Sequence, residues 1–255
     1  MGICVFIIGA LLGSFYLVIG SRLLLNENVI TGRSRCDHCK TNLRWYELIP
    51  LISYVMQLGK CRTCKKKISS LHIIMELATG ILFLVGYLYY GIDLKLGIYL
   101  VIISVALIIF VSDFKYMIIL DSPLIIGSIL IIVLRYFEIG LKNTIYSCIY
   151  GIILFLVMYL IKIIGDKMYK RESLGGGDIK LCFLIGLTLG YPGIGFRLSL
   201  ISLIFAAFLA LPYAMLSVYL NKKNELPFGP FLISSMIIMF VFIDKFKNLL
   251  LLFMI

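Results

Sequence analysis

Hydrophobic residues are gathered into long runs along this chain, separated by short polar stretches. The runs cover residues 2–25, 72–91, 97–112, 122–138, 144–164, 179–191, 197–220 and 229–243. A helix needs about 20 apolar residues to cross the hydrocarbon core of a membrane. The pattern therefore predicts an all-α polytopic membrane protein with about eight transmembrane helices. The run at 179–191 is short and contains glycine, so we expect it to begin deeper than the preceding loop suggests.

The overall composition supports a membrane protein. Of the 255 residues, 62% are hydrophobic and 15% are charged, whereas soluble domains average about 45–50% and about 25%. A soluble chain of this length could not bury so much apolar surface, so a water-soluble enzyme is excluded, as is a disordered chain. The seven cysteines are too sparse, and odd in number, for a secreted disulfide scaffold.

A polar insert follows the first apolar run. Residues 26–70 hold nine of the 24 Lys and Arg residues, four of the seven cysteines and the only Trp. The first run lacks a basic start and a small-residue cleavage site, so we expect a retained helix rather than a signal peptide. The predicted organisation is a first transmembrane helix at 1–25, a cytoplasmic insert at 26–70, and a membrane core of about seven helices at 71–255.

Basic residues are distributed unequally between the two sides of the predicted bundle. With the insert inside, the inner loops carry 18 of the 24 Lys and Arg residues. Cytoplasmic loops are rich in these residues, so the N-terminus is predicted outside and the insert in the cytoplasm. Contact with anionic headgroups of the lipid bilayer explains the net charge of +11. Few aromatic residues interleave with the basic run at 65–67, so a nucleic-acid partner is not supported.

Four cysteines of the insert have the spacing of a metal site. They form two Cys-x-x-Cys pairs separated by 21 residues, Cys36 with Cys39 and Cys61 with Cys64. Four thiolates in tetrahedral geometry suit Zn²⁺, and thiols in the cytosol stay reduced. A closed four-cysteine site leaves no position for water, so the predicted zinc is structural and compensates for a small core. A redox-active or unligated set of cysteines is the alternative.

Two acidic residues near the ends of predicted helices are candidates for chemistry. Asp113 precedes a cytoplasmic turn, and Asp178 opens the sixth run directly after Gly175, Gly176 and Gly177. A carboxylate at membrane depth costs roughly 2.5–3.5 kcal/mol, and the glycines predict a flexible or unwound helix start. Two carboxyl groups in a partly dry site would share one proton, so that one activates water and the other polarises a scissile carbonyl. Helix caps or loop charges are the alternative.

No other catalytic set is visible in the sequence. The two histidines are His38, among the cysteines, and His72, at a helix boundary. The chain has no Gly-x-Ser-x-Gly, His-Glu-x-x-His or phosphate-binding loop motif. Hydrolysis by a Ser/His/Asp triad or by catalytic zinc is therefore poorly supported.

Six motifs in the right order resemble those of the type IV prepilin peptidases. These are membrane aspartic peptidases of the GxGD type, and they include the competence-pseudopilin processing enzymes. The motifs cover nearly the whole chain: Gly13-Ser14-Phe15 with Arg22, Arg35 to Cys39 followed by Leu43 to Pro50, Gly59 to Cys64 with Glu76, Asp113 to Asp121, Leu174 to Leu181, and Pro227 to Phe231. The chain departs from the family pattern at Ser112, Leu120 and His72.

The resemblance implies an activity and roles for individual residues. Asp113 and Asp178 take the catalytic positions, whereas Asp121 does not. The implied substrate is a prepilin or pseudopilin whose basic leader is cleaved after a Gly at the cytoplasmic face of the bacterial inner membrane. Family members with the cysteine insert resemble bifunctional enzymes that also methylate the new N-terminal amine with S-adenosylmethionine. No glycine-rich nucleotide-binding motif identifies the residues that would bind this cofactor here.

Three readings of function remain open from the sequence. The first is this peptidase, with or without methyl transfer. The second is a transporter in which the Asp pair relays protons or cations, and the third is a membrane scaffold whose zinc insert binds a partner. A transporter would show repeats and paired broken helices in both halves, whereas a glycine-interrupted segment occurs only at 175–178.

Overall fold

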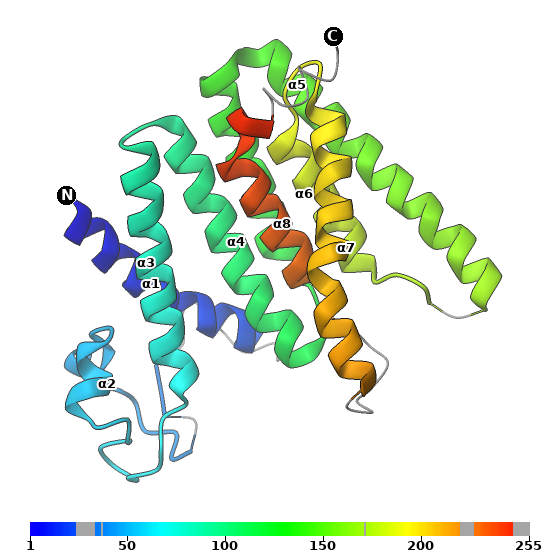
Figure 1. The fold of residues 1–255 in the computed structure, drawn as a ribbon. Helices are drawn as coiled ribbons and strands as arrows, with labels where there is room; N and C mark the ends of the chain where they lie inside the picture. The colour runs from blue at the N-terminus through cyan, green and yellow to red at the C-terminus, as the bar shows by residue number, and fades with distance from the viewer. Residues whose placement is uncertain (24–33, 37, 171, 220–226, 247–255) are drawn as a thin grey trace. The chain divides into compact units, whose positions relative to one another are not determined.

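The structure is built from α-helices (Figure 1). The computed structural model describes residues 1–23, 34–36, 38–170, 172–219 and 227–246. Within these ranges it contains two isolated β-bridges and no strand. The elements are α1 (Gly2–Arg22), η2 (Trp45–Leu48), α2 (Ile52–Met56), α3 (Ser70–Tyr90), α4 (Leu94–Tyr116), α5 (Asp121–Tyr169), α6 (Gly176–Leu189), α7 (Gly195–Tyr219) and α8 (Gly229–Val241). The predicted all-α fold is confirmed for this part of the chain.

Every predicted apolar run corresponds to a helix or to part of one. Among the described residues, five helices are long and apolar enough to cross a membrane, namely α1, α3, α4, α5 and α7. The chain is therefore an integral membrane protein. The 14-residue α6 measures about 21 Å at 1.5 Å per residue, less than a bilayer core of about 30 Å. The count of about eight spans stays a prediction. Parts of the predicted inner loops and the C-terminal tail, at 26–33, 221–226 and 247–255, lie outside the described residues.

Two of the predicted runs, 122–138 and 144–164, belong to one long element. Helix α5 spans 49 residues, and Gly140 interrupts it with φ +80° and ψ +165°. This backbone region is open to glycine and strained for other residues. Gly140 therefore ends the first apolar segment and allows the second to begin.

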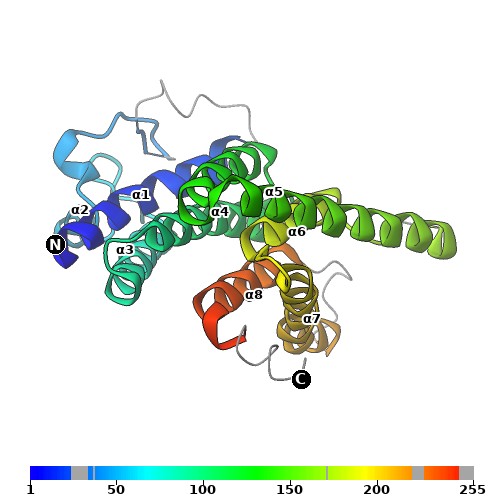
Figure 2. The same cartoon turned by 90° about the horizontal axis from the view of Figure 1, so that it is seen from above.

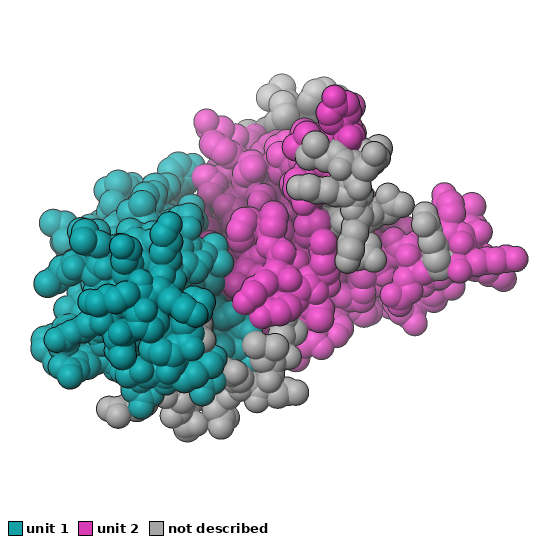
Figure 3. Space-filling view, turned by 90° about the horizontal axis from the view of Figure 1, so that it is seen from below, with its two compact units in different colours: residues 1–96 teal, residues 97–255 magenta. Residues whose placement is uncertain are grey.

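The chain divides into two compact units, residues 1–96 and 97–255 (Figure 3). Unit 1 contains α1, the insert and α3, and unit 2 contains nearly all of α4 together with α5 to α8. The cysteines of the insert and the two candidate aspartates thus belong to different units.

Helices α1 and α3 form the frame of unit 1 and pack against each other in opposite directions. Small residues line their contact. A Cβ on Gly9 would lie 3.0 Å from the Cα of Gly80, and a Cβ on Gly13 would lie 2.7 Å from the backbone oxygen of Met75. Such distances leave no room for a side chain, so glycine lets the two backbones approach as closely as they do.

Helix α6 forms the centre of unit 2 and is the element that carries Asp178. Nine of its residues are buried, and it packs against α5, α7 and α8 (Figure 2). A Cβ on Gly186 would lie 2.6 Å from the Cα of Gly151 in α5. Close packing on several sides fixes α6 in place, and with it the position of the residue at its start.

A buried polar cluster holds the opposite end of α6. Arg135 of α5 is 0% exposed and donates a hydrogen bond to the backbone oxygen of Thr188. Its guanidinium lies 3.2 Å from the carboxylate of Glu138 and 4.1 Å from the ring centre of Tyr191. The cation satisfies a carbonyl at the C-terminal end of α6, where positive charge is favourable.

Candidate active site and metal centre

Asp113 lies in the last turn of α4 and is buried, with 5% of its surface exposed. Its backbone oxygen accepts a hydrogen bond from Met117, which closes the helix. Its side-chain Oδ2 is shielded from solvent and has no hydrogen-bond partner among the described residues. A buried polar atom without a partner is costly unless a ligand, a water or a proton satisfies it, so this oxygen is a candidate for such an interaction.

Asp178 is the third residue of α6, and its N-cap is Gly175. A Cβ on Gly175 would lie 3.0 Å from Oδ2 of Asp178, so the missing side chain leaves space for the carboxyl group over the helix start. The other oxygen, Oδ1, is also buried and has no partner within the described part of the chain. Both candidate acids therefore present one unsatisfied oxygen.

The three glycines before Asp178 have no unusual backbone, and they differ in how closely they are packed. Gly176 and Gly177 are the first two residues of α6, and Gly175 has φ −64°. We expected the glycines to give a flexible or unwound helix start. In the structure α6 instead begins at Gly176, before Asp178. A Cβ on Gly177 would lie 2.6 Å from Cβ of Ile119, whereas one on Gly176 would meet nothing within 4 Å. Gly177 is the member of the triplet that the fold requires to be small.

Ile119, in the loop after α4, connects the surroundings of the two acids. It contacts Gly177 beside Asp178, and a Cβ on Gly229 would lie 3.0 Å from its Cδ1. The same Cβ would lie 2.9 Å from Oδ2 of Asp113, and the backbone N–H of Gly229 faces the Asp113 carboxylate as a donor. The two carboxyl groups are close enough for their charges to interact. The structure therefore brings Asp113 and Asp178 together.

No local pattern in the sequence assigns a function to Gly229. The motif Pro227 to Phe231, which contains it, points to function only through the family resemblance. A glycine followed by a proline at the start of an apolar helix is the signal that could have indicated a close backbone approach. Its target, Asp113, lies too far away in the sequence for any local pattern to identify.

Asp121 is placed differently from the two candidate acids. Both of its carboxylate oxygens lie 2.7 Å from Nζ of Lys180, and both side chains are about half exposed. This ion pair joins the start of α5 to the first turns of α6. A charge that is already paired in this way suits a role in holding α6 rather than in chemistry.

The four cysteine sulfurs of the insert converge on one point of unit 1. All four lie within 4.8 Å of one another. Sγ of Cys36 is 4.0 Å from that of Cys64, and Sγ of Cys39 is 3.9 Å from that of Cys61. Four ligands at 2.3 Å around a tetrahedral ion would be about 3.8 Å apart, whereas a disulfide needs about 2.05 Å. The cluster could therefore hold a metal ion.

The two cysteine pairs are built as matching turns, hereafter the cysteine knuckles. In the first, Cys36 N–H donates to the oxygen of Thr41 and Lys40 N–H donates to the oxygen of Cys36. Cys61, Lys66 and Lys65 repeat these bonds in the second. Lys40 and Lys65 have φ +57° and +59°, the left-handed conformation that turns each chain back on itself. Each turn points both of its sulfurs to the same side.

Hydrogen bonds prepare two of these thiols for metal binding. The Thr41 side chain lowers the pKa of the Cys39 thiol to about 6. The backbone N–H of Cys64 lowers the pKa of the Cys61 thiol. Despite a backbone hydrogen bond from Lys66, burial and the neighbouring thiols raise the pKa of the Cys64 thiol to about 11. Two of the four thiols are therefore prepared as thiolates, the form that binds a metal.

Comparison with known proteins decides between the open readings of function. Residues 100–243 match the model of the type IV leader peptidase family, and residues 7–90 match that of the bacterial peptidase A24 N-terminal domain. The chain belongs to the type IV leader peptidase family. The resemblance indicated by the six motifs is thereby confirmed, and the transporter reading is not favoured.

Individual relatives are similar over most of their length. The chain is 34% identical over 241 residues to the prepilin leader peptidase/N-methyltransferase of Bacillus subtilis (strain 168), covering 94% of each chain. It is 31% identical over 250 residues to the protein of that name from Vibrio cholerae, covering 92% of this chain and 94% of the relative. No solved structure matches the chain. The two matched domains fall on either side of the boundary between the two units.

Proposed function

We propose that this chain is a membrane aspartic endopeptidase that removes the leader from type IV prepilins or pseudopilins and then methylates the new N-terminus. The observation that carries the proposal is the pairing of Asp113 and Asp178, each with an unsatisfied buried oxygen. Membership of a leader peptidase family and relatives named for both activities support it.

The two carboxyl groups suffice for peptide hydrolysis. In the proposed reaction one ionised carboxylate takes a proton from water while the water oxygen attacks the scissile carbonyl carbon. The second carboxyl group, protonated, donates a hydrogen bond to the carbonyl oxygen and then gives its proton to the leaving amine as the C–N bond breaks. Gly177 and Gly229 keep the site compact, because neither places a side chain between the acids and their neighbours.

The cysteine cluster is proposed to bind one Zn²⁺ in a structural role. Four thiolates at tetrahedral spacing leave no open position for water or substrate. Cys36, Cys39, Cys61 and Cys64 would then tie the two knuckles together in an insert that buries few apolar residues.

Methyl transfer is proposed to follow cleavage. S-adenosylmethionine, when bound, supplies a methyl group whose bond to the sulfonium sulfur breaks as its bond to the N-terminal nitrogen forms, leaving S-adenosylhomocysteine and a proton. The task of the chain is to hold this donor and to present the new amine to it.

The proposed topology places the insert and both acids at the cytoplasmic face. The excess of Lys and Arg on that side supports this orientation. A prepilin has its basic leader in the cytosol and its apolar helix in the membrane, so a scissile bond at the boundary requires carboxyl groups at the same depth. The N-terminus would then lie outside.

Replacement of the acids tests the proposal. Asp113→Asn and Asp178→Asn should each lower leader cleavage by roughly 10³-fold or more, because an amide cannot act as base or carry the proton. Asp121→Asn, which removes only one partner of the exposed ion pair with Lys180, is the matched control and should remain active. Purified protein, a prepilin peptide and mass spectrometry give the readout. Turnover by either of the first two variants within about tenfold of the wild-type rate would refute the paired-carboxylate mechanism.

A further inference from the structure

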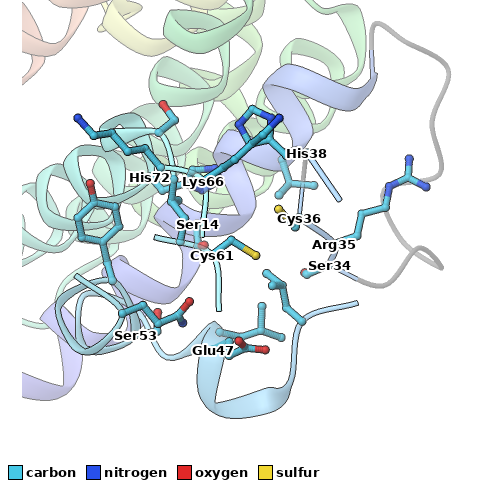
Figure 4. A pocket seen from close by; sticks show the side chains of 18 of the residues that line it. Ser14, Ser34, Arg35, Cys36, His38, Glu47, Ser53, Cys61, Lys66 and His72 are labelled. Carbon is cyan, nitrogen blue, oxygen red and sulfur yellow. The ribbon is translucent and has the colours of Figure 1, made fainter. Parts of the chain in front are cut away.

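The short helix α2 of the insert is amphipathic in the reverse of the usual sense. Ile52, Val55 and Met56 share one face at helical spacing, hereafter the outer face of α2, and they are between 56% and 80% exposed. Ser53 and Tyr54, on the rest of the helix surface, line a cavity of unit 1 (Figure 4). Polar side chains therefore point into the unit, and apolar side chains point out of it.

Two further large apolar residues flank α2 in the sequence and are also exposed, Trp45 at 78% and Leu58 at 84%. A soluble domain rarely exposes so many apolar side chains within so short a segment, and such a surface marks contact with a membrane or a partner. The insert lies in the chain between α1 and α3, which are both long and apolar enough to span a membrane. A lipid surface is thus always within its reach.

A hydrogen bond fixes the position of α2 along α3. The backbone N–H of Leu51, directly before α2, donates to Oε2 of Glu76 at 2.8 Å. Glu76 lies six residues after Ser70, the first residue of α3, which is about 9 Å along the helix at 1.5 Å per residue. The whole of α3 measures about 31 Å, close to the thickness of a bilayer core of about 30 Å. The start of α2 therefore lies level with the part of α3 that enters the bilayer.

The turn before α2 sets which of its faces points outward. Leu51 has φ +63° and ψ −51°, and Ile52 N–H donates to the oxygen of Pro50 at 2.6 Å across it. This γ-turn with positive φ is rare for a residue with a side chain, and it persists only where surrounding contacts enforce it. The bond from Leu51 N–H to Glu76 is such a contact. The orientation of the outer face is thus part of the fold of unit 1.

The charge of the insert favours a lipid surface over a protein partner. Residues 44–67 contain six Lys or Arg residues and a single acid, Glu47. Lys60, Arg62 and Lys65 are among the basic residues that are exposed. Basic residues near an apolar face bind anionic headgroups while the apolar side chains enter the boundary with the acyl chains. Tryptophan is enriched at the same boundary.

We propose that the outer face of α2, together with Trp45, docks the insert onto the anionic lipid leaflet that contains the start of α3. Ile52, Val55 and Met56 lie in the boundary between headgroups and acyl chains, and the leaflet holds the cysteine knuckles close to the membrane. This inference concerns the surface of the insert and depends on neither the peptidase nor the methyl-transfer activity.

The fluorescence of Trp45, the only Trp in the chain, tests this docking. The purified full-length protein is reconstituted into vesicles of phosphatidylcholine and phosphatidylglycerol, with brominated acyl chains in one preparation and ordinary chains in the other. Brominated chains should lower the Trp45 emission by roughly twofold or more, because bromine quenches a ring at the boundary. Acrylamide, added from the water, should quench Trp45 less than it quenches tryptophan in solution.

A pair of variants compares the two faces of α2. In a Trp45→Phe background, Met56→Trp places the fluorophore on the outer face and should be quenched by brominated lipid as Trp45 is. Tyr54→Trp is the matched control, because position 54 lines the cavity, and it should be quenched far less. Equal quenching of the two variants would contradict docking through the outer face.

The remaining outcomes identify what else covers the surface. Quenching of Trp45 or of Met56→Trp by acrylamide but not by brominated lipid would show that the position meets water, and it would overturn the inference. Protection from both quenchers would show that protein covers the surface, and it would overturn the inference as well. The wild-type chain carries Trp45 without any substitution, so its response decides even if a variant does not fold.

Discussion

Gly229, the first residue of α8, lies directly against the carboxyl group of Asp113. Its backbone N–H faces the carboxylate, and a Cβ at this position would come within 2.9 Å of Oδ2. The contact gives the Pro227 to Phe231 motif a physical role, since the motif starts a helix where the backbone closely approaches a candidate catalytic acid.

Replacing Gly229 by Ala should lower leader cleavage by roughly 10–100-fold, because displacement of a catalytic group by about 1 Å has an effect of this size. The added Cβ would push against both Asp113 and Ile119. Gly97→Ala in α4 is the control, since its Cβ would lie at 3.4 Å from Leu134, near ordinary contact distance. Rates of peptide cleavage at saturating substrate would show the effect, and a Gly229→Ala rate within twofold of the wild type would contradict it.

Two neighbouring glycines of the triplet should respond differently to the same change. Gly177→Ala should reduce cleavage by about tenfold, since its Cβ would lie 2.6 Å from Ile119 and shift the start of α6. Gly176→Ala should leave cleavage near the wild-type rate, because a Cβ there meets nothing within 4 Å. Neither residue has a positive φ, so the comparison reports space alone. Equal activities of the two variants would show that the triplet is not a packing element.

The cysteine cluster should carry one zinc ion per chain, measured by elemental analysis of protein purified without chelators. Cys36→Ser should lose the metal and increase amide hydrogen exchange across residues 34–68. Cys148→Ser is the control, since that cysteine lies in α5 of unit 2 and is not one of the four converging sulfurs. A full metal content in Cys36→Ser would argue against the four-sulfur site.

The buried cluster around Arg135 should contribute strongly to stability. Arg135→Ala removes the cation from Glu138, which keeps its hydrogen bond from the Tyr191 hydroxyl, and from the Thr188 oxygen. Breaking a buried pair in this way costs about 3–5 kcal/mol. Arg135→Lys should not restore stability fully, because an ammonium cannot reproduce the planar contacts with Glu138 and Tyr191. Thermal unfolding in detergent measures the effect, with exposed Lys142→Ala as control. Equal melting temperatures for Arg135→Ala and the wild type would disprove this role.

Local features of the chain were readable from the sequence alone. A run of about 20 apolar residues implies a helix in a membrane wherever it occurs. The spacing of Cys36 with Cys39 and of Cys61 with Cys64 is likewise local, and each pair forms its own knuckle. Asp113 and Asp178 were candidates because a carboxylate at membrane depth is costly and commonly functional. Their actual roles in catalysis stay proposals.

The partners of these residues were decided by the tertiary structure. Gly229 meets Asp113, Glu76 holds the turn at Leu51, and α1 lies on α3 through Gly9 and Gly80. The membrane-spanning helices are apolar around most of their circumference, so no hydrophobic stripe marks the face that turns inward, as it would in a soluble helix. Which faces meet depends on where glycines allow close approach and on which buried polar groups find one another. Both conditions involve residues far apart in the chain, and only the folded structure brings them together.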